Sequence, residues 1–333
     1  MHTRQYVILS CCLIAAAMLT FSCKKGKTDT GTDNADSAQI VPLTFDSDSA
    51  MVHIEAQCQW GPRTPGSTAH DRCAAYIAET FRRYGLSVAE QHVTLQGWDG
   101  KSFPCVNITA SYKPEASDRI VICSHWDSRP WADNDPDSAK HREPVMAAND
   151  GASGVAVMME LARQLDKLNP AVGIDFVCFD MEDYGAPYWG TGKDDGTDWC
   201  LGSQYWAANL PQGYKPRYGI LLDMVGGADT QFRYEYYSRQ FAPDIVAQVW
   251  SCAISEEAKE VFRHEDGTAA MDDHIPMNRI AHIPTIDIIG ETGNGFSSTW
   301  HTVSDTPANI SRKHLKAVGQ TLLQKLYEEK SER

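Results

Sequence analysis

Apolar residues in this chain occur in two alternating patterns, which are short continuous runs and longer stretches at helical spacing. The runs Ile120–Cys123, Phe176–Phe179 and Thr285–Ile289 are wholly or mostly apolar, as is typical of strands buried on both faces. Between the first two runs, apolar side chains recur at helical spacing from Val155 to Leu165. The order strand, helix, strand predicts a β-α-β crossover between parallel strands.

The preceding part of the chain has a different pattern. Val88–Leu95 and Val106–Tyr112 alternate polar and apolar residues, which predicts an antiparallel pair at the sheet edge. Helical spacing continues elsewhere, and it predicts helices at Asp71–Arg83, Ala242–Ala258 and Ile310–Tyr327. Strands that alternate with helices after an antiparallel start predict an α/β fold. We expect a mixed, mostly parallel central sheet flanked by helices on both faces.

Composition supports one large domain, which we assign to residues 40–333. The chain has 333 residues, of which 42% are hydrophobic and 22% charged, and no internal repeat is visible. A net charge of −14 argues against a nucleic-acid partner, which needs a basic face. Seven of the ten cysteines follow residue 40, and they lack C-x-x-C spacing, so neither a disulfide framework nor a cysteine zinc site is predicted. We expect a monomer.

The N-terminal residues indicate export. Residues 1–22 have a basic start and an apolar stretch too short for a membrane span, as in a signal peptide. Leu19–Cys23 resembles a bacterial lipobox, although Thr20 stands where Leu is usual. Residues 23–39 contain no large apolar side chain and predict a flexible tether. We therefore expect a periplasmic lipoprotein anchored to the inner or outer membrane through Cys23; the alternative is an ordinary cleaved signal peptide.

Side chains that suit zinc stand at the ends of the predicted strands. His125 and Asp127 follow one strand, and Glu182 and Asp183 follow the next. The others are Asp150 before a predicted helix, Asp223 after the run Gly219–Met224, and His301. Because the carboxyl ends of parallel strands meet at one edge of a sheet, these residues should converge there. Each alone is better explained as a cap or turn residue, but the mixture of histidine and carboxylate suits catalytic zinc.

The motifs around these positions resemble those of the type II glutaminyl cyclases of animals and Bacteroidetes, a branch of the zinc-aminopeptidase superfamily. The superfamily motifs are His125-Trp-Asp127, Asn149-Asp-Gly-Ala-Ser-Gly154, Glu182-Asp183, Asp223-Met-Val-Gly226 and Trp300-His-Thr302. The motifs that resemble this branch specifically are Arg63-Thr-Pro-Gly-Ser67, Met158-Met-Glu-Leu-Ala-Arg163, Asp272-Asp-His-Ile-Pro276 and again Trp300-His-Thr302. The resemblance extends from about Arg63 to the C terminus. It implies a zinc-aminopeptidase-like (phosphorylase/hydrolase-like) fold and conversion of N-terminal glutamine of peptides or proteins to pyroglutamate, with release of ammonia.

The resemblance also implies a role for individual residues. One zinc ion is expected to be bound by Asp150, Asp183 and His301, with Asp183 standing where the family usually has Glu. Glu182 matches the catalytic acid and base. The acidic partners that hydrogen-bond around it match Asp223 and Asp272. The apolar walls of the substrate pocket match Trp300, Phe296 and Trp189.

The number of metal ions is left open by the sequence. In the two-zinc aminopeptidases of this superfamily, the residue matching His125 binds a second metal with Asp223, and Asp150 bridges the two. A zinc-dependent aminopeptidase is therefore the alternative function. Asp272 favours the cyclase, because an extra acid beside Asp223 would build a proton-sharing cluster in the second metal's place. Asp127 is expected to orient a neighbour. A non-catalytic surface binding protein is disfavoured by the complete set of metal ligands and by Glu182.

Overall fold

The computed structural model describes residues 39–193 and 195–330. The signal peptide predicted for residues 1–22, the lipid-anchor position Cys23 and nearly all of the tether lie outside the described residues. The described residues from Ile40 onward form one compact unit.

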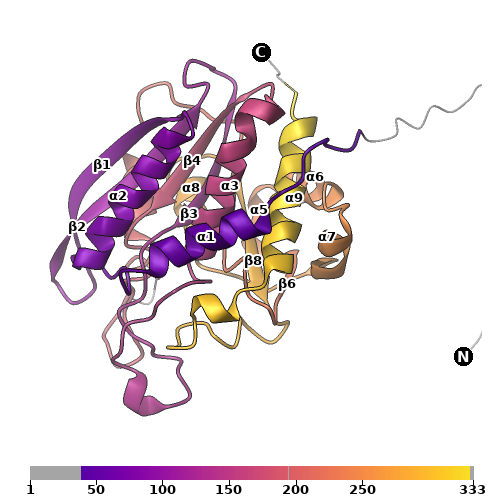
Figure 1. The fold of residues 1–333 in the computed structure, drawn as a ribbon. Helices are drawn as coiled ribbons and strands as arrows, with labels where there is room; N and C mark the ends of the chain where they lie inside the picture. Colours follow the sequence, from indigo (N-terminus) through magenta and orange to yellow (C-terminus); the bar gives the residue numbers. More distant parts are fainter. Residues whose placement is uncertain (1–38, 194, 331–333) are drawn as a thin grey trace, which may run out of the picture. The chain divides into compact units, whose positions relative to one another are not determined.

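The described residues form an eight-stranded sheet (Figure 1). In spatial order the strands are β1 (Ser87–Gln96), β2 (Ser102–Tyr112), β4 (Gly173–Phe179), β3 (Arg119–His125), β5 (Gly219–Asp223), β8 (Thr285–Glu291), β6 (Gln231–Tyr234) and β7 (Phe262–Asp266). β4, β3, β5 and β8 are parallel neighbours, whereas β1 and β2 are antiparallel and β6 is antiparallel to β8. The predicted mixed, mostly parallel sheet with an antiparallel start is confirmed.

The β-α-β crossover sets the geometry of the strand ends. Helix α3 (Ala152–Leu168) connects β3 to β4, and the two strands pair in parallel from Arg119–Gly173 to His125–Phe179. His125 therefore lies directly beside Phe179, three residues before Glu182. The register of two buried strands thus brings two of the predicted site segments together.

Helices cover both faces of the sheet, as predicted. One face packs against α1 (Ser47–Cys58), α2 (Thr68–Arg83), α3 and α9 (Arg312–Glu328), which lie in front of the sheet in Figure 1. The other face packs against α4 (Leu201–Ala208) and α8 (His274–Arg279). Along β3, Ile120 and Ile122 point into the first core and Val121 and Cys123 into the second. This alternation explains why the strand has no polar face.

The C-terminal half differs from the prediction. The single helix predicted for Ala242–Ala258 is wrong: the chain forms α5 (Tyr236–Phe241), α6 (Pro243–Ser251) and α7 (Glu256–Val261). Pro243 occupies the first turn of α6, where its missing N–H costs nothing, and Ser255 caps α7 by accepting a hydrogen bond from the N–H of Ala258. β6, β7 and α8 were not predicted, because each has six residues or fewer.

Two further observations concern the length of the helices and the state of the cysteines. Within residues 39–193 and 195–330 the helices are all too short or too polar to traverse a lipid bilayer. The seven cysteines that follow residue 40 are unpaired and buried. Cys73, Cys123 and Cys178 act as small apolar side chains in the core.

Candidate active site

The three predicted zinc ligands lie together at the carboxyl edge of the sheet. His301 Nε2 is 3.1 Å from Asp183 Oδ1 and 3.5 Å from Asp150 Oδ2, and all three side chains are buried. Each offers one ligand atom, and the three atoms lie within 4.8 Å of one another. Asp150 stands just before α3, Asp183 follows β4, and His301 follows β8 along the chain.

A second trio adjoins the first and shares Asp150. His125 Nε2 is 2.9 Å from Asp150 Oδ1 and 3.3 Å from Asp223 Oδ1. These three ligand atoms also lie within 4.8 Å of one another. His125 and Asp223, which end β3 and β5, are therefore placed where a second ion would bind in a two-metal site.

The carboxylates of this site fit a divalent cation. Asp150 Oδ2, Asp183 Oδ2 and Asp223 Oδ1 are buried and accept no hydrogen bond from any described residue. Buried carboxylate oxygens without a donor are costly, and a cation relieves that cost. Two histidines among three aspartates are a ligand set that suits zinc.

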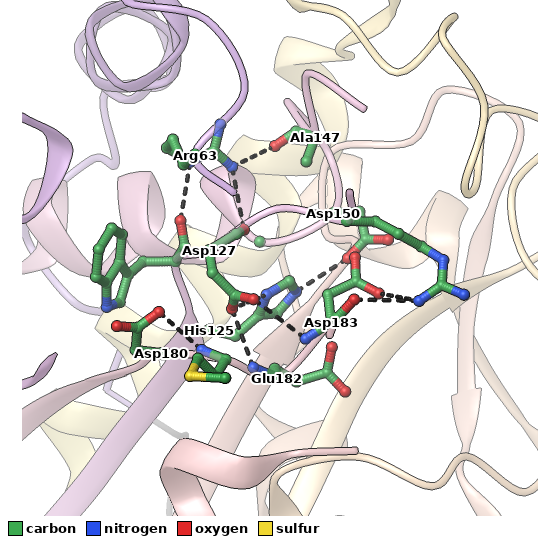
Figure 2. A network of polar contacts seen from close by, with 12 residues as sticks. Arg63, His125, Asp127, Ala147, Asp150, Asp180, Glu182 and Asp183 are labelled. Carbon is green, nitrogen blue, oxygen red and sulfur yellow. Dashed lines mark hydrogen bonds and ion pairs between the residues drawn. The ribbon is translucent and has the colours of Figure 1, made fainter. Parts of the chain in front are cut away.

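Asp127 lies behind the ligands and holds three groups at once (Figure 2). Its Oδ1 is 3.4 Å from His125 Nδ1 and accepts a hydrogen bond from the N–H of Glu182 at 3.1 Å. Its Oδ2 accepts a hydrogen bond from the N–H of Asp183 at 3.2 Å. The structure thus places Asp127 as an orienting residue, with no ligand atom in either trio.

Arg129 and Asp133 support His301, and sequence reasoning missed both. Asp133 Oδ1 is 3.5 Å from His301 Nδ1, and the Arg129 guanidinium donates to both carboxylate oxygens of Asp133 at 2.7 and 2.6 Å. Although burial opposes it, the hydrogen bond from Arg129 holds the pKa of Asp133 well below its usual range. Arg129 Nη1 is also 3.4 Å from Asp183 Oδ1. The i, i+4 spacing of Arg129 and Asp133, shortly after His125, is the sequence signal that could have indicated this ion pair.

Glu182 faces the cavity among other carboxyl groups. Burial, together with the nearby Asp183 and Asp272 and against the opposing charge of His125, raises the pKa of Glu182 well above its usual range. Burial raises the pKa of Asp223 to about 6. Burial and then the charge of Asp223 raise the pKa of Asp272 to about 7. Carboxyl groups that titrate near neutral pH are suited to accept and return protons.

The cavity over these groups has a volume of about 430 Å³. Trp300 and Phe296 line it, as predicted, and their rings pack edge to face with centroids 4.7 Å apart. The prediction for Trp189 is wrong, because this residue does not line the cavity and instead lies 4.6 Å from the Arg142 guanidinium. Trp199 forms the wall in its place.

A backbone hydrogen bond explains why Trp199, and not Trp189, lines the cavity. The N–H of Cys200 donates to the carbonyl of Glu182 at 3.0 Å, which draws the preceding residue, Trp199, onto the site. The Trp199 ring is parallel to that of His301, with an interplanar angle of 2° and centroids 6.2 Å apart. Trp189 lies ten residues earlier, in the outer part of the same loop.

Two buried groups near the site have structural roles. Asp180, the first acid after β4, is turned away from the cavity and accepts hydrogen bonds from His70 Nε2 at 2.9 Å and from the N–H of Val106 at 2.7 Å. Arg63 is fully buried and donates to the backbone carbonyl of Ala147 at 2.8 Å (Figure 2). It also donates to the carbonyls of Trp126 and Met146 at 2.8 and 2.7 Å. Arg63 thereby holds both ends of the loop that connects Asp127 to Asp150.

The fold and these candidate metal ligands agree with a family assignment: the chain belongs to peptidase family M28, whose family model matches residues 107–326. Two solved structures share its fold over nearly their whole length. A glutaminyl cyclase of Bacteroides thetaiotaomicron is 46% identical, with a TM-score of 0.84, covering 86% of this chain and 99% of that one. A leucine aminopeptidase precursor of the same organism is 45% identical, with a TM-score of 0.84, covering 88% of this chain and 100% of that one.

The chain is also similar to part of a longer curated protein. The uncharacterized protein YfbL of Escherichia coli is 32% identical over 160 residues, which cover 48% of this chain and 43% of that protein. The match therefore spans less than half of that relative. Together the comparisons confirm the predicted fold and the relationship to Bacteroidetes glutaminyl cyclases. They place cyclases and exopeptidases at nearly equal similarity, so they define a zinc-dependent M28 enzyme.

Proposed function

We propose that this protein is a glutaminyl-peptide cyclotransferase, which converts the N-terminal glutamine of peptides or proteins to pyroglutamate and releases ammonia. The observation that carries the proposal is the carboxyl cluster beside the metal ligands. Glu182 and Asp272 offer oxygens within 4.8 Å of one another, and the pKa values of Asp272 and Asp223 are raised to about 7 and about 6. A carboxyl group that shares a proton is a poor metal ligand, which favours one zinc ion and a proton relay.

The reaction requires little of the protein beyond positioning and proton transfer. The α-amine of the substrate attacks its own side-chain amide, so neither a nucleophilic side chain nor water takes part. A zinc ion held by Asp150, Asp183 and His301 would polarise the γ-carbonyl and stabilise its developing negative charge. Glu182 takes a proton from the attacking amine and gives a proton to the departing ammonia.

The cavity walls serve the same chemistry. Trp199, Trp300 and Phe296 give the cavity an apolar lining above a carboxylate floor. Apolar walls exclude water, which would otherwise hydrolyse the amide, and they favour the bent conformation in which the amine meets the carbonyl.

A zinc aminopeptidase is the second candidate. It is supported by His125, Asp150 and Asp223, whose ligand atoms lie close enough to share an ion, and by the similarity to a leucine aminopeptidase precursor. An aminopeptidase must activate water and shorten the peptide by one residue, whereas a cyclase keeps every residue.

Product mass separates the two functions. We expect a peptide that begins with Gln to lose the mass of one ammonia and to become blocked to N-terminal sequencing. Matched peptides that begin with Leu or Ala should remain intact, and the protein should contain one zinc ion per chain. Release of free N-terminal amino acids by protein with two metal ions would overturn the cyclase proposal and make His125 a metal ligand.

A further inference from the structure

Cys200 contacts the active-site residue Glu182, but its thiol has no part in the proposed reaction. Its Sγ is 3.2 Å from Glu182 Oε1. The thiol donates a hydrogen bond to this carboxyl oxygen. The backbone of Cys200 is fixed as well, since its N–H donates to the carbonyl of Glu182 and the next N–H, of Leu201, donates to Met181. Thiol and carboxylate are therefore held together by the fold.

Asp272 completes a group of three ligand types. One of its oxygens accepts a hydrogen bond from the N–H of Asp273, and the other, Oδ2, is buried and accepts none from the described residues. One ligand atom each from Glu182, Cys200 and Asp272 lies within 4.8 Å of the other two. An oxygen left without a donor beside a thiol and a second carboxylate is an arrangement that a cation would satisfy.

The group is open to ions from two sides. Glu182 and Asp272 line the main cavity, and Cys200 and Asp272 line a smaller cavity of about 120 Å³ that adjoins it. Both cavities are bordered by Trp199 and Met271. An ion that enters either cavity therefore reaches the group without passing through the protein core.

We infer that Glu182, Cys200 and Asp272 form a second cation site, separate from the Asp150, Asp183 and His301 site, which binds thiophilic divalent ions such as Cd²⁺ or excess Zn²⁺. A thiolate with two carboxylates suits these ions, whereas Mg²⁺ prefers an octahedron of oxygens and water. Binding replaces the thiol proton, which is released to solvent, by a metal–sulfur bond.

An ion at this site would inhibit the enzyme. It would occupy the carboxylate of Glu182, which then has no free oxygen with which to move protons. Activity would thus require zinc at one site and be lost when a thiophilic ion fills the other. This consequence rests on the proposed role of Glu182, whereas binding of the ion does not.

Cadmium is the probe that tests the site. Protein that contains one zinc ion per chain is titrated with CdCl₂, and the near-ultraviolet absorption of a cadmium–thiolate bond is followed together with turnover of a Gln-starting peptide. We expect absorption and inhibition to appear at the same Cd²⁺ concentration, with zinc content unchanged. Cadmium that merely replaced the zinc would give no such band, because Asp150, Asp183 and His301 contain no sulfur. MgCl₂ at equal concentration should have no effect.

Two substitutions locate the ion. Cys200→Ser should abolish the band and raise the inhibitory Cd²⁺ concentration about tenfold or more, since a ligand is lost. Cys252→Ser is the matched control: Cys252 Sγ also lies near a glutamate, 3.5 Å from Glu328 Oε2, yet no third ligand joins this pair among the described residues. This control should titrate like the unaltered protein.

Each result of the cadmium titrations either supports or overturns the proposed cation site. A band that persists in Cys200→Ser, or is lost in Cys252→Ser, would overturn the site. If Cys200→Ser does not fold, Asp272→Asn replaces it and should shift the band to about tenfold higher Cd²⁺; an unshifted band would again overturn the inference. Protein that shows the band but never cyclises glutamine would contradict the proposed function and leave the cation site standing.

Discussion

The carboxylate of Asp127 accepts a hydrogen bond from the backbone N–H of Glu182 at 3.1 Å, so the residue proposed to move protons is positioned through its main chain. The same carboxylate orients His125 through Nδ1 and accepts from the N–H of Asp183. One fully buried side chain therefore fixes the end of β4 relative to the end of β3.

Substituting Asp127→Asn should lower both turnover and zinc affinity, each by about ten- to a hundredfold. An amide has only one acceptor oxygen, so either Glu182 or Asp183 loses the bond to its N–H. Turnover of a Gln-starting peptide and competition with a zinc chelator measure the two effects. The matched control is Asp46→Asn, because Asp46 also accepts two backbone N–H groups but caps α1. Equal behaviour of the two variants would mean that Asp127 does not position the site.

Glu182→Gln should reduce turnover by about a hundred- to ten-thousandfold while zinc stays bound. The amide is nearly the same size as the carboxyl group but does not accept and return a proton. Rate measurements combined with metal analysis test this, and Glu55→Gln on the exposed side of α1 serves as a control. A near-normal rate with zinc present would exclude Glu182 as the proton shuttle.

Asp150→Ala should remove the metal, because Asp150 belongs to both ligand trios. His125→Asn should instead retain one zinc ion per chain, since His125 belongs only to the second trio. Metal analysis after dialysis against a weak chelator distinguishes the variants. If His125→Asn binds one ion fewer than the unaltered protein, the two-metal aminopeptidase is favoured.

His53 should make stability depend on pH. Burial lowers the pKa of His53 to about 4, and its two nitrogens lie 2.7 and 3.1 Å from the hydroxyls of Tyr76 and Tyr84. The unfolded chain takes up this proton near pH 6.5 and the folded protein only near pH 4. The contribution of neutral His53 is therefore complete above pH 6.5 and is lost as the pH falls toward 4.

The effect is isolated by comparing the protein with His53→Gln. Between pH 7 and pH 4.5 the unaltered protein should lose roughly 2 kcal/mol more unfolding free energy than the variant. Denaturant titrations at the two pH values give both quantities. If both proteins lose the same unfolding free energy between the two pH values, His53 has an ordinary pKa in the folded state.

A chain that starts at Ile40 should fold and remain active, because the lipid anchor proposed at Cys23 is not needed by the fold. The N–H of Val41 donates to Gln324 Oε1, and Phe45 is 1% exposed and packs closely against Gly319 of α9. A chain that starts at Asp46 should lose about 3 to 5 kcal/mol with the buried phenylalanine. Thermal unfolding and activity compare the two chains. If the chain that starts at Ile40 loses activity that the full-length protein keeps, the domain boundary lies earlier.

Local patterns revealed the parts of the site that follow buried strands. Asp183 and Asp223 were found because each follows an apolar run, and β3 lies between these two runs in the sheet and pairs in parallel with both. The i, i+4 spacing of Arg129 and Asp133 indicates at most their own ion pair, whereas the contact of Asp133 with His301, more than 160 residues later, has no local pattern. Such contacts become visible only once the chain is folded.

Trp189 and Trp199 show a second limit of predicting the site from the sequence. Trp189 and Trp199 are the same residue type in one loop rich in glycine and aspartate, so composition does not tell them apart. Hydrogen bonds of the adjacent backbone place Trp199 in the site. Likewise β6 and β7 are too short to show a pattern, and they form because β8 and α6 provide a surface for them.

The buried guanidinium of Arg63 has a consequence for the order of folding. Its hydrogen bonds to the carbonyls of Trp126 and Ala147 join residues 63 and 84 positions apart in the chain. Contacts of such long range form only after the entropy of closing the intervening segments has been overcome, and they tend to be made late. Asp150, the proposed zinc ligand, follows Ala147 by three residues. Metal uptake during refolding should therefore trail the formation of the sheet and report the final stage of assembly.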